Sequence, residues 1–183
     1  MLYNVIATKW NGRRNGRKNM RLDLREIINI PGKSVPFDYP PALEELEFDS
    51  VARVLPDARA VGQVRNTAGV LELKANLSVD LECICARCLK EFPRHIEQPV
   101  EAVLADEIQD EENSDIYLLE GDYIDLDEVI LTAFVLNMDQ RFLCGEDCKG
   151  LCPKCGKNLN DGPCDCKADV DPRLTVLSSL LEK

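Results

Sequence analysis

The sequence has little of what catalysis and nucleic-acid binding commonly use. It contains one histidine, one tryptophan and 5% aromatic residues, and 22 lysines and arginines stand against 33 aspartates and glutamates, giving a net charge of -11. Contact with nucleic acid depends on clustered cations, and binding of single strands depends on stacking aromatic rings, so the composition argues against both. His95 falls in a predicted strand, which favours a surface or packing role over catalysis. We therefore expect no enzymatic activity.

Long apolar runs are also missing. The longest lies near Val129 to Met138 and is shorter than the roughly 20 residues that span a bilayer. The sequence shows no secretory signal, and nine cysteines in a metal-like arrangement indicate a reducing compartment. We expect a cytoplasmic protein without membrane contact.

Cysteine is abundant, and most of it falls in one short stretch. Zinc prefers four thiolate or imidazole ligands, often delivered as C-x-x-C pairs closed by a loop. Cys152 and Cys155 form such a pair, Gly156 allows the positive φ of the turn, and turn-forming residues precede the last two cysteines. The stretch predicts a small zinc-knuckle module with a structural zinc ion. The candidate ligands are Cys144, Cys148, Cys152, Cys155, Cys164 and Cys166.

Other readings of this stretch fit less well. Disulfides suit small secreted chains, and a redox dithiol needs only one C-x-x-C pair, usually in a βαβ context. An iron-sulfur cluster is the second choice of metal group. Which four thiols bind stays open: Cys152 and Cys155 are favoured, but the C-x-C spacing of Cys164 and Cys166 is tight, so Cys144 or Cys148 could replace one of that pair.

A second C-x-x-C pair, Cys85 and Cys88, lies far from this stretch. A lone pair packs or stays free about as often as it binds metal. Together with the six distal cysteines the pair makes eight thiols, the number that two four-cysteine sites need. We favour one distal site, with Cys85 and Cys88 as additional candidate ligands and Cys83 as a core residue.

Strict alternation of apolar and polar residues from Leu71 to Cys83 predicts a half-buried strand. A turn at 66–69 makes Arg59 to Arg65 its antiparallel partner, and the alternation returns from Phe92 to Leu104. A helix is predicted to begin at Asp125, and it is apolar nearly all round, so we expect the sheet to cover one side and the cysteine module or a partner the other. A last helix begins at Asp171-Pro172.

The predicted fold class is therefore α+β: an antiparallel β-sheet meander packed by a buried helix and a C-terminal helix, with a small cysteine-rich zinc-knuckle module. Residues 1–19 form a basic disordered arm, or Met20 is the natural start, and 20–105 form a β-rich region. An acidic linker follows at 106–124, and 125–183 hold the helix, the module and the last helix. The eleven acids from Asp106 to Glu128, with no basic residue among them, are typical of a solvated segment.

Several motifs in this order resemble the YceD family, the large ribosomal RNA subunit accumulation proteins. They are Met20-Arg21-Leu22-Asp23-Leu24, Gly69-Val70-Leu71, Cys85-Ala86-Arg87-Cys88-Leu89, Cys148 through Gly156, and Asp171-Pro172-Arg173-Leu174. The resemblance spans Met20 to Leu181, and the combined order is far more specific than any single C-x-x-C pair.

The resemblance implies a non-catalytic role in the synthesis, processing or stability of large-subunit ribosomal RNA, and hence in ribosome biogenesis. Its implied partners are a precursor of the large ribosomal subunit, ribosomal proteins or rRNA-processing factors. The acidic charge favours contact with a basic protein over direct contact with rRNA. The alternatives are a zinc-thiolate redox switch and a chaperone-like protein acting on a basic partner; a zinc or thiol enzyme would need an open metal position or a basic partner for the nucleophile.

Overall fold

The structure is a computed structural model that describes residues 20–43, 46–106 and 116–166. Two predictions lie outside these residues, the basic arm at 1–19 and the helix from Asp171. Within the described ranges no helix is long and apolar enough to cross a membrane.

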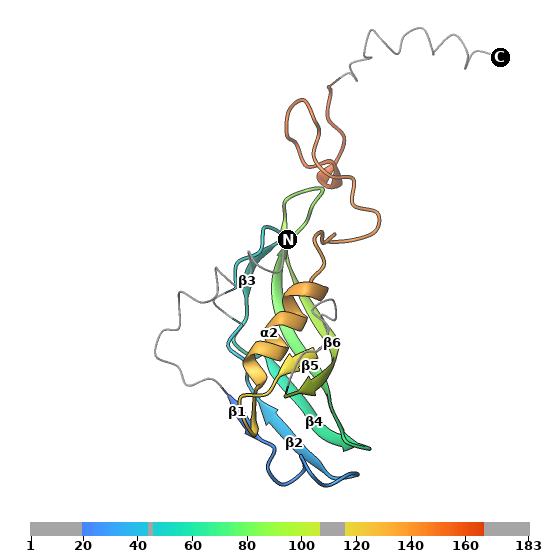
Figure 1. Ribbon diagram of the computed structural model, residues 1–183. Coiled ribbons are helices and arrows are strands. Elements are labelled where there is room, and N and C mark those ends of the chain that lie inside the picture. Colours follow the sequence, from blue (N-terminus) through green and yellow to red (C-terminus); the bar gives the residue numbers. More distant parts are fainter. Residues whose placement is uncertain (1–19, 44–45, 107–115, 167–183) are drawn as a thin grey trace, which may run out of the picture.

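The main body is one six-stranded sheet with strand order β2-β4-β5-β6-β7, in which β3 also pairs with β5 (Figure 1). Neighbouring strands run antiparallel, except that β7 is parallel to β6. The predicted meander corresponds to β4, β5 and β6. The strand bounds are β2 Ser34–Tyr39, β3 Val51–Val54, β4 Arg59–Thr67, β5 Val70–Ile84, β6 Glu91–Ala105 and β7 Ile116–Leu118.

Alternation along β5 separates the two faces of the sheet. The odd-numbered apolar side chains from Leu71 to Cys83 face the core, and all of them are buried except Ala75, which is partly buried; the polar residues between them face outward. Cys83 is fully buried in the main apolar cluster, as its place in the alternation predicts. A two-residue turn with positive φ at both Ala68 and Gly69 joins β4 to β5, which is the geometry that type I′ hairpin turns require.

Asn66 fixes the segment that precedes β2 against this hairpin. Its side chain is 1% exposed. The amide nitrogen donates to the carbonyl oxygens of Ile27 and Ile28 at 2.8 and 2.9 Å, and the amide oxygen accepts from the backbone N–H of Gly69 at 2.8 Å.

Helix α2, Leu126–Asn137, lies over one face of the sheet (Figure 1). As predicted, Asp125 caps it: its carboxylate accepts from the backbone N–H groups of Asp127 and Glu128. Phe134 is fully buried and meets Phe48 edge to face at 5.8 Å between ring centroids. The expectation of a second cover from the cysteine module is wrong. Leu136 is 55% exposed, and the module lies beyond the end of the sheet.

The second half of the predicted acidic linker carries short strands. β7 extends the sheet, and β8, Tyr123–Asp125, pairs with β1, Arg21–Asp23, as a separate two-stranded sheet. The chain therefore returns to the N-terminal strand of the described part just before α2 begins.

Candidate metal centre

Eight of the nine cysteines gather in two groups of four, and in each group the sulfur atoms all lie within 4.8 Å of one another. The bracing cluster consists of Cys85, Cys88, Cys144 and Cys148. The knuckle cluster consists of Cys152, Cys155, Cys164 and Cys166. This differs from the single distal site that the sequence favoured, because the six distal cysteines divide between the clusters and two of them join the pair at the distant turn.

The bracing cluster joins two parts of the chain that are far apart in sequence. Cys85 and Cys88 lie in the turn between β5 and β6, whereas Cys144 and Cys148 follow α2. The Sγ atoms of Cys85 and Cys148 are 3.7 Å apart, as are those of Cys88 and Cys144. Three of the four side chains are buried, and only Cys144 is exposed.

Backbone contacts hold the segment that leads from α2 to Cys144 against the β5–β6 turn. Phe142 forms a parallel bridge with Cys85, and its carbonyl oxygen accepts from the N–H of Ala86 at 2.8 Å. The path from α2 to Cys144 is thereby fixed against the turn. This pairing of segments, which no local pattern encodes, is what assigns Cys144 to the bracing cluster.

Arg87, between the two cysteines of the turn, contacts the module directly. Its guanidinium donates to the carbonyl oxygens of Glu146 and Cys148 at 3.2 and 3.0 Å, and its own carbonyl accepts from the N–H of Leu151 at 3.1 Å. Gly150 has a φ of +72°, and a Cβ atom added there would lie 3.0 Å from the Arg87 carbonyl oxygen. The close approach therefore depends on glycine.

The knuckle cluster is local. Gly156, with a φ of +71°, donates its N–H to the carbonyl of Cys152 at 2.9 Å, as the turn after the C-x-x-C pair predicts. A single 3-10 turn, η1 Leu159–Asp161, is capped by Asn158 and leads to Cys164 and Cys166, which both belong to the cluster. Neither Cys144 nor Cys148 replaces Cys164 or Cys166 in this cluster, because both are held at the β5–β6 turn with Cys85 and Cys88. Cys155 and Cys166 are exposed.

The sulfur spacing fits a tetrahedral zinc ion. With Zn–S bonds of about 2.3 Å, the sulfurs of a tetrahedral four-thiolate site lie about 3.8 Å apart. The two Sγ–Sγ distances of 3.7 Å in the bracing cluster match this value. The knuckle cluster offers the same four donors within the same limit of 4.8 Å.

Electrostatics also favour a cation in both clusters. In the knuckle cluster, the backbone N–H groups of Cys155 and Lys154 lower the pKa of Cys152 to about 6, whereas the neighbouring thiols, Cys155 first, raise the pKa of Cys166 to about 12. In the bracing cluster, the thiols of Cys85 and Cys88 likewise raise the pKa of Cys144 to about 12. Four crowded thiols oppose one another's ionisation, and a bound divalent ion removes that opposition.

His95 lies apart from both clusters, on the outer face of β6. Its Nδ1 is 2.7 Å from a carboxylate oxygen of Asp80, and its Nε2 is 3.8 Å from one of Glu97. The Asp80 carboxylate raises the pKa of this exposed histidine. The arrangement is that of a surface ion pair.

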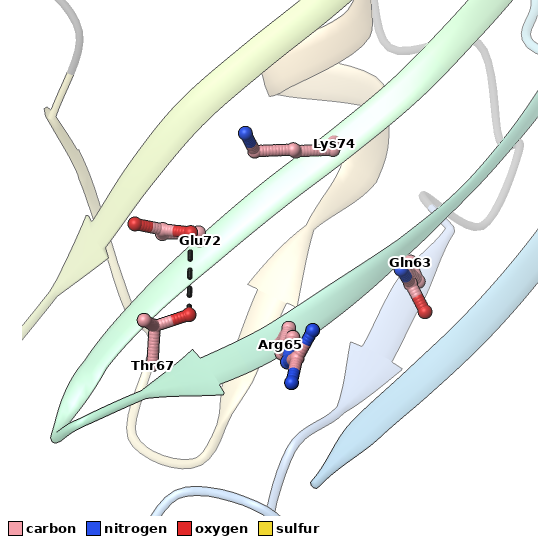
Figure 2. Close-up of a pocket in the computed structure, with 5 residues that line it drawn as sticks. All are labelled: Gln63, Arg65, Thr67, Glu72 and Lys74. Atoms are coloured by element: carbon pink, nitrogen blue, oxygen red, sulfur yellow. Dashed lines mark hydrogen bonds between the residues drawn. The ribbon is translucent and has the colours of Figure 1, made fainter. Parts of the chain in front are cut away.

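A hollow of about 370 Å³ lies on the same outer face, near the β4–β5 turn (Figure 2). It is lined by Gln63, Arg65, Thr67, Glu72 and Lys74, and the Thr67 hydroxyl donates to Glu72 at 3.2 Å. These side chains stand on an open strand surface and include neither a thiol nor an imidazole. The metal-binding geometry is therefore found in the cysteine clusters and not in this hollow.

Comparison with known proteins gives a family match. The model described as "Large ribosomal RNA subunit accumulation protein YceD" matches residues 73–181, which include all eight cysteines of the two clusters. The chain is also 32% identical over 101 residues to the uncharacterized proteins Rv2926c of Mycobacterium tuberculosis (strain ATCC 25618 / H37Rv) and Mb2951c of Mycobacterium bovis (strain ATCC BAA-935 / AF2122/97). That alignment covers 53% of this chain and 49% of each relative, so the chain spans about half the length of these curated relatives. No solved structure matches.

Proposed function

The chain belongs to the YceD family of large ribosomal RNA subunit accumulation proteins, and from this membership we propose that it supports the synthesis, processing or stability of large-subunit ribosomal RNA without catalysing a reaction. The observation that carries the proposal is the pair of complete four-cysteine clusters within the matched residues. A catalytic zinc ion commonly keeps one position for water or substrate, whereas a structural ion is bound by four protein ligands. Four thiols in each cluster suit the structural role.

In this proposal each cluster holds one structural zinc ion. The ion in the bracing cluster would fix the module to the β5–β6 turn, and the ion in the knuckle cluster would close the module itself. The chain's own contribution is to present four sulfurs, to orient them with backbone N–H groups, and to bury three of the four bracing thiols.

The proposed partner is a basic ribosomal protein or an rRNA-processing factor on a precursor of the large subunit. A net charge of -11 attracts a basic protein surface and repels the phosphate backbone. Such a contact weakens with salt, because exposed charges are screened beyond about 8 Å at physiological ionic strength.

Gradient sedimentation of cell lysate at low and high salt tests the proposal. We expect the protein to migrate with free large subunits or their precursors at low salt and to leave them at high salt. A Cys148→Ser variant should lose the association, whereas Cys83→Ala, which removes a core thiol outside both clusters without burying a new polar group, should keep it. A protein that stays at the top of the gradient at both salts would contradict the proposed association.

The exposure of the knuckle cluster supports a second candidate, a zinc-thiolate redox switch. Cys155 and Cys166 are both exposed, in contrast to the largely buried bracing cluster. Peroxide would oxidise two thiolates to a disulfide, with two protons taken up and two waters formed, and the zinc ion would leave. Mild peroxide should then release one ion per chain and leave the second bound. An unchanged metal content would exclude the switch.

A further inference from the structure

Asn160 connects the two clusters. It belongs to η1, in the loop between Cys155 and Cys164 of the knuckle cluster. Its side-chain Nδ2, however, lies 3.4 Å from the Sγ atom of Cys148, which is a bracing-cluster thiol. A residue positioned by one cluster thus donates a hydrogen bond to the other.

The orientation of this amide is fixed by its remaining partners. Oδ1 accepts from the backbone N–H of Lys149 at 2.8 Å. Because a backbone N–H can only donate, the oxygen must face Lys149 and the NH₂ group must face the sulfur. Asn158 holds the same amide from the other side, since its Oδ1 accepts from Nδ2 at 2.7 Å and from the backbone N–H of Asn160 at 3.0 Å.

A hydrogen bond to a metal-bound thiolate stabilises the whole site. Four thiolates around one divalent ion carry a net charge of about -2, and an N–H donor at one sulfur offsets part of it. Loss of such an outer contact commonly costs 10–100-fold in metal affinity. The Asn160 contact is of this kind, because Cys148 is itself buried and the amide approaches it directly.

The loop that carries Asn160 is closed by the knuckle cluster. Cys152 and Cys155 precede η1, and Cys164 and Cys166 follow it. An ion bound by all four would fix both ends of the loop and so reduce the entropy that is lost when Asn160 docks against Cys148. Without that ion the docking would depend on the loop's own hydrogen bonds.

We propose that Asn160 is a positioning residue through which an occupied knuckle cluster slows metal loss from the bracing cluster. The inference rests on the proposed occupancy of both clusters by zinc. It makes the metal affinities of the two clusters depend on each other.

Metal release from the full-length protein tests this dependence. Cadmium replaces zinc in both clusters, and ¹¹³Cd NMR gives each ion its own resonance, assigned with Cys85→Ser and Cys155→Ser variants. In Asn160→Asp, which keeps the acceptor for Lys149 but loses the N–H donor, we expect loss of the bracing-cluster ion to a chelator to speed up about tenfold or more. The Cys164→Ser/Cys166→Ser variant should speed it up to a similar degree.

Combining the changes separates this dependence from general loosening of the module. If Asn160→Asp and Cys164→Ser/Cys166→Ser act through the same contact, the combined variant should lose the bracing-cluster ion little faster than either alone. Asn160→Ala removes the donor without adding a charge and should show the same acceleration, whereas Asn137→Asp, at the exposed end of α2, should show none.

Two outcomes would overturn the inference in distinguishable ways. Fewer than two ions per wild-type chain, measured by elemental analysis, would remove the proposed zinc sites on which it rests. Two ions per chain with unchanged release from the bracing cluster in Asn160→Asp and Asn160→Ala would remove the role of Asn160 and leave the zinc sites standing.

Discussion

Replacing Cys148 by serine should destabilise the sheet far more than replacing Cys164, although each change removes one thiol from one cluster. Cys85 and Cys148 are 63 positions apart, whereas Cys152 and Cys164 are 12 apart. If a metal cross-link is treated like a disulfide, the loop-entropy relation gives about 4 kcal/mol for the long loop and about 3 kcal/mol for the short one. The long loop contains β6 and α2, so its closure constrains the core.

The short loop contains no member of the main apolar core. We therefore expect Cys148→Ser to lower the free energy of unfolding of the sheet by up to about 4 kcal/mol. Cys164→Ser should lower it by about 1.4 kcal/mol, because it reaches the sheet only through a bracing-cluster ion that is held about tenfold less tightly. Amide hydrogen exchange at Leu81 and Cys83 in β5, recorded on the zinc-loaded chain at increasing urea concentrations, measures the free energy of unfolding of the sheet directly.

Chelation provides the internal control. When a chelator is added to both proteins, most of the difference in free energy of unfolding between wild type and Cys148→Ser should disappear, because neither protein then has the metal cross-link. Equal destabilisation of the sheet by Cys148→Ser and Cys164→Ser, or a difference that persists after chelation, would refute the reasoning.

Three further predictions concern other contacts. Gly150→Ala should lower the free energy of unfolding by about 1–3 kcal/mol, because alanine is strained at this φ and its Cβ would lie 3.0 Å from the Arg87 carbonyl oxygen. Thermal unfolding of the zinc-loaded protein measures this loss, and an unchanged Tm would contradict it. Asn66→Ala should lower the free energy of unfolding by about 3 kcal/mol, measured by urea unfolding, since it removes three hydrogen bonds from the side chain to backbone groups; an unchanged midpoint would contradict the role given to this residue. Asp80→Asn should lower the pKa of His95 toward 6.5, and an NMR titration of the one histidine measures this shift. Because the pair raises that pKa on folding, its contribution to stability is present below pH 6.5 and is lost as pH rises through the raised value. In the variant this contribution should shrink to the smaller part that Glu97 supplies.

Periodicity predicted the long elements because they repeat their signal many times. Strand β5 alternates over thirteen residues from Leu71 to Cys83, and α2 combines an apolar pattern with the Asp125 cap. Strands such as β3 and β7 have four and three residues, too few to separate from irregular chain, and they form because longer neighbours offer them hydrogen bonds. The last turn of α2 faces solvent at Leu136, so the cysteine module does not cover it there, and cover by a partner stays a prediction.

Cysteine spacing identified all eight candidate ligands but not how they divide. The spacing of cysteines predicts which neighbouring thiols can bind one ion, and it favours Cys152 with Cys155. It cannot predict that a distant turn, here Cys85 to Cys88, approaches the same region in the folded chain. The one sequence feature that indicates two sites is the total of eight cysteines besides Cys83, which is the number that two four-cysteine sites need. The contact of Asn160 with Cys148 had no such signal, because asparagine in this loop is equally typical of a turn.

The separation of the bracing ligands in sequence also has a consequence in time. Cys88 and Cys144 are 56 positions apart, and at about 5–20 residues per second the ribosome adds the second pair about 3–11 s after the first. During that interval the nascent chain carries Cys85 and Cys88 without the other two thiols of their cluster, whereas the knuckle cluster is synthesised within about 3 s. The four thiols of the bracing cluster are therefore all present only late in biosynthesis, so an ion that needs all four could bind there only after the knuckle-cluster residues begin to follow.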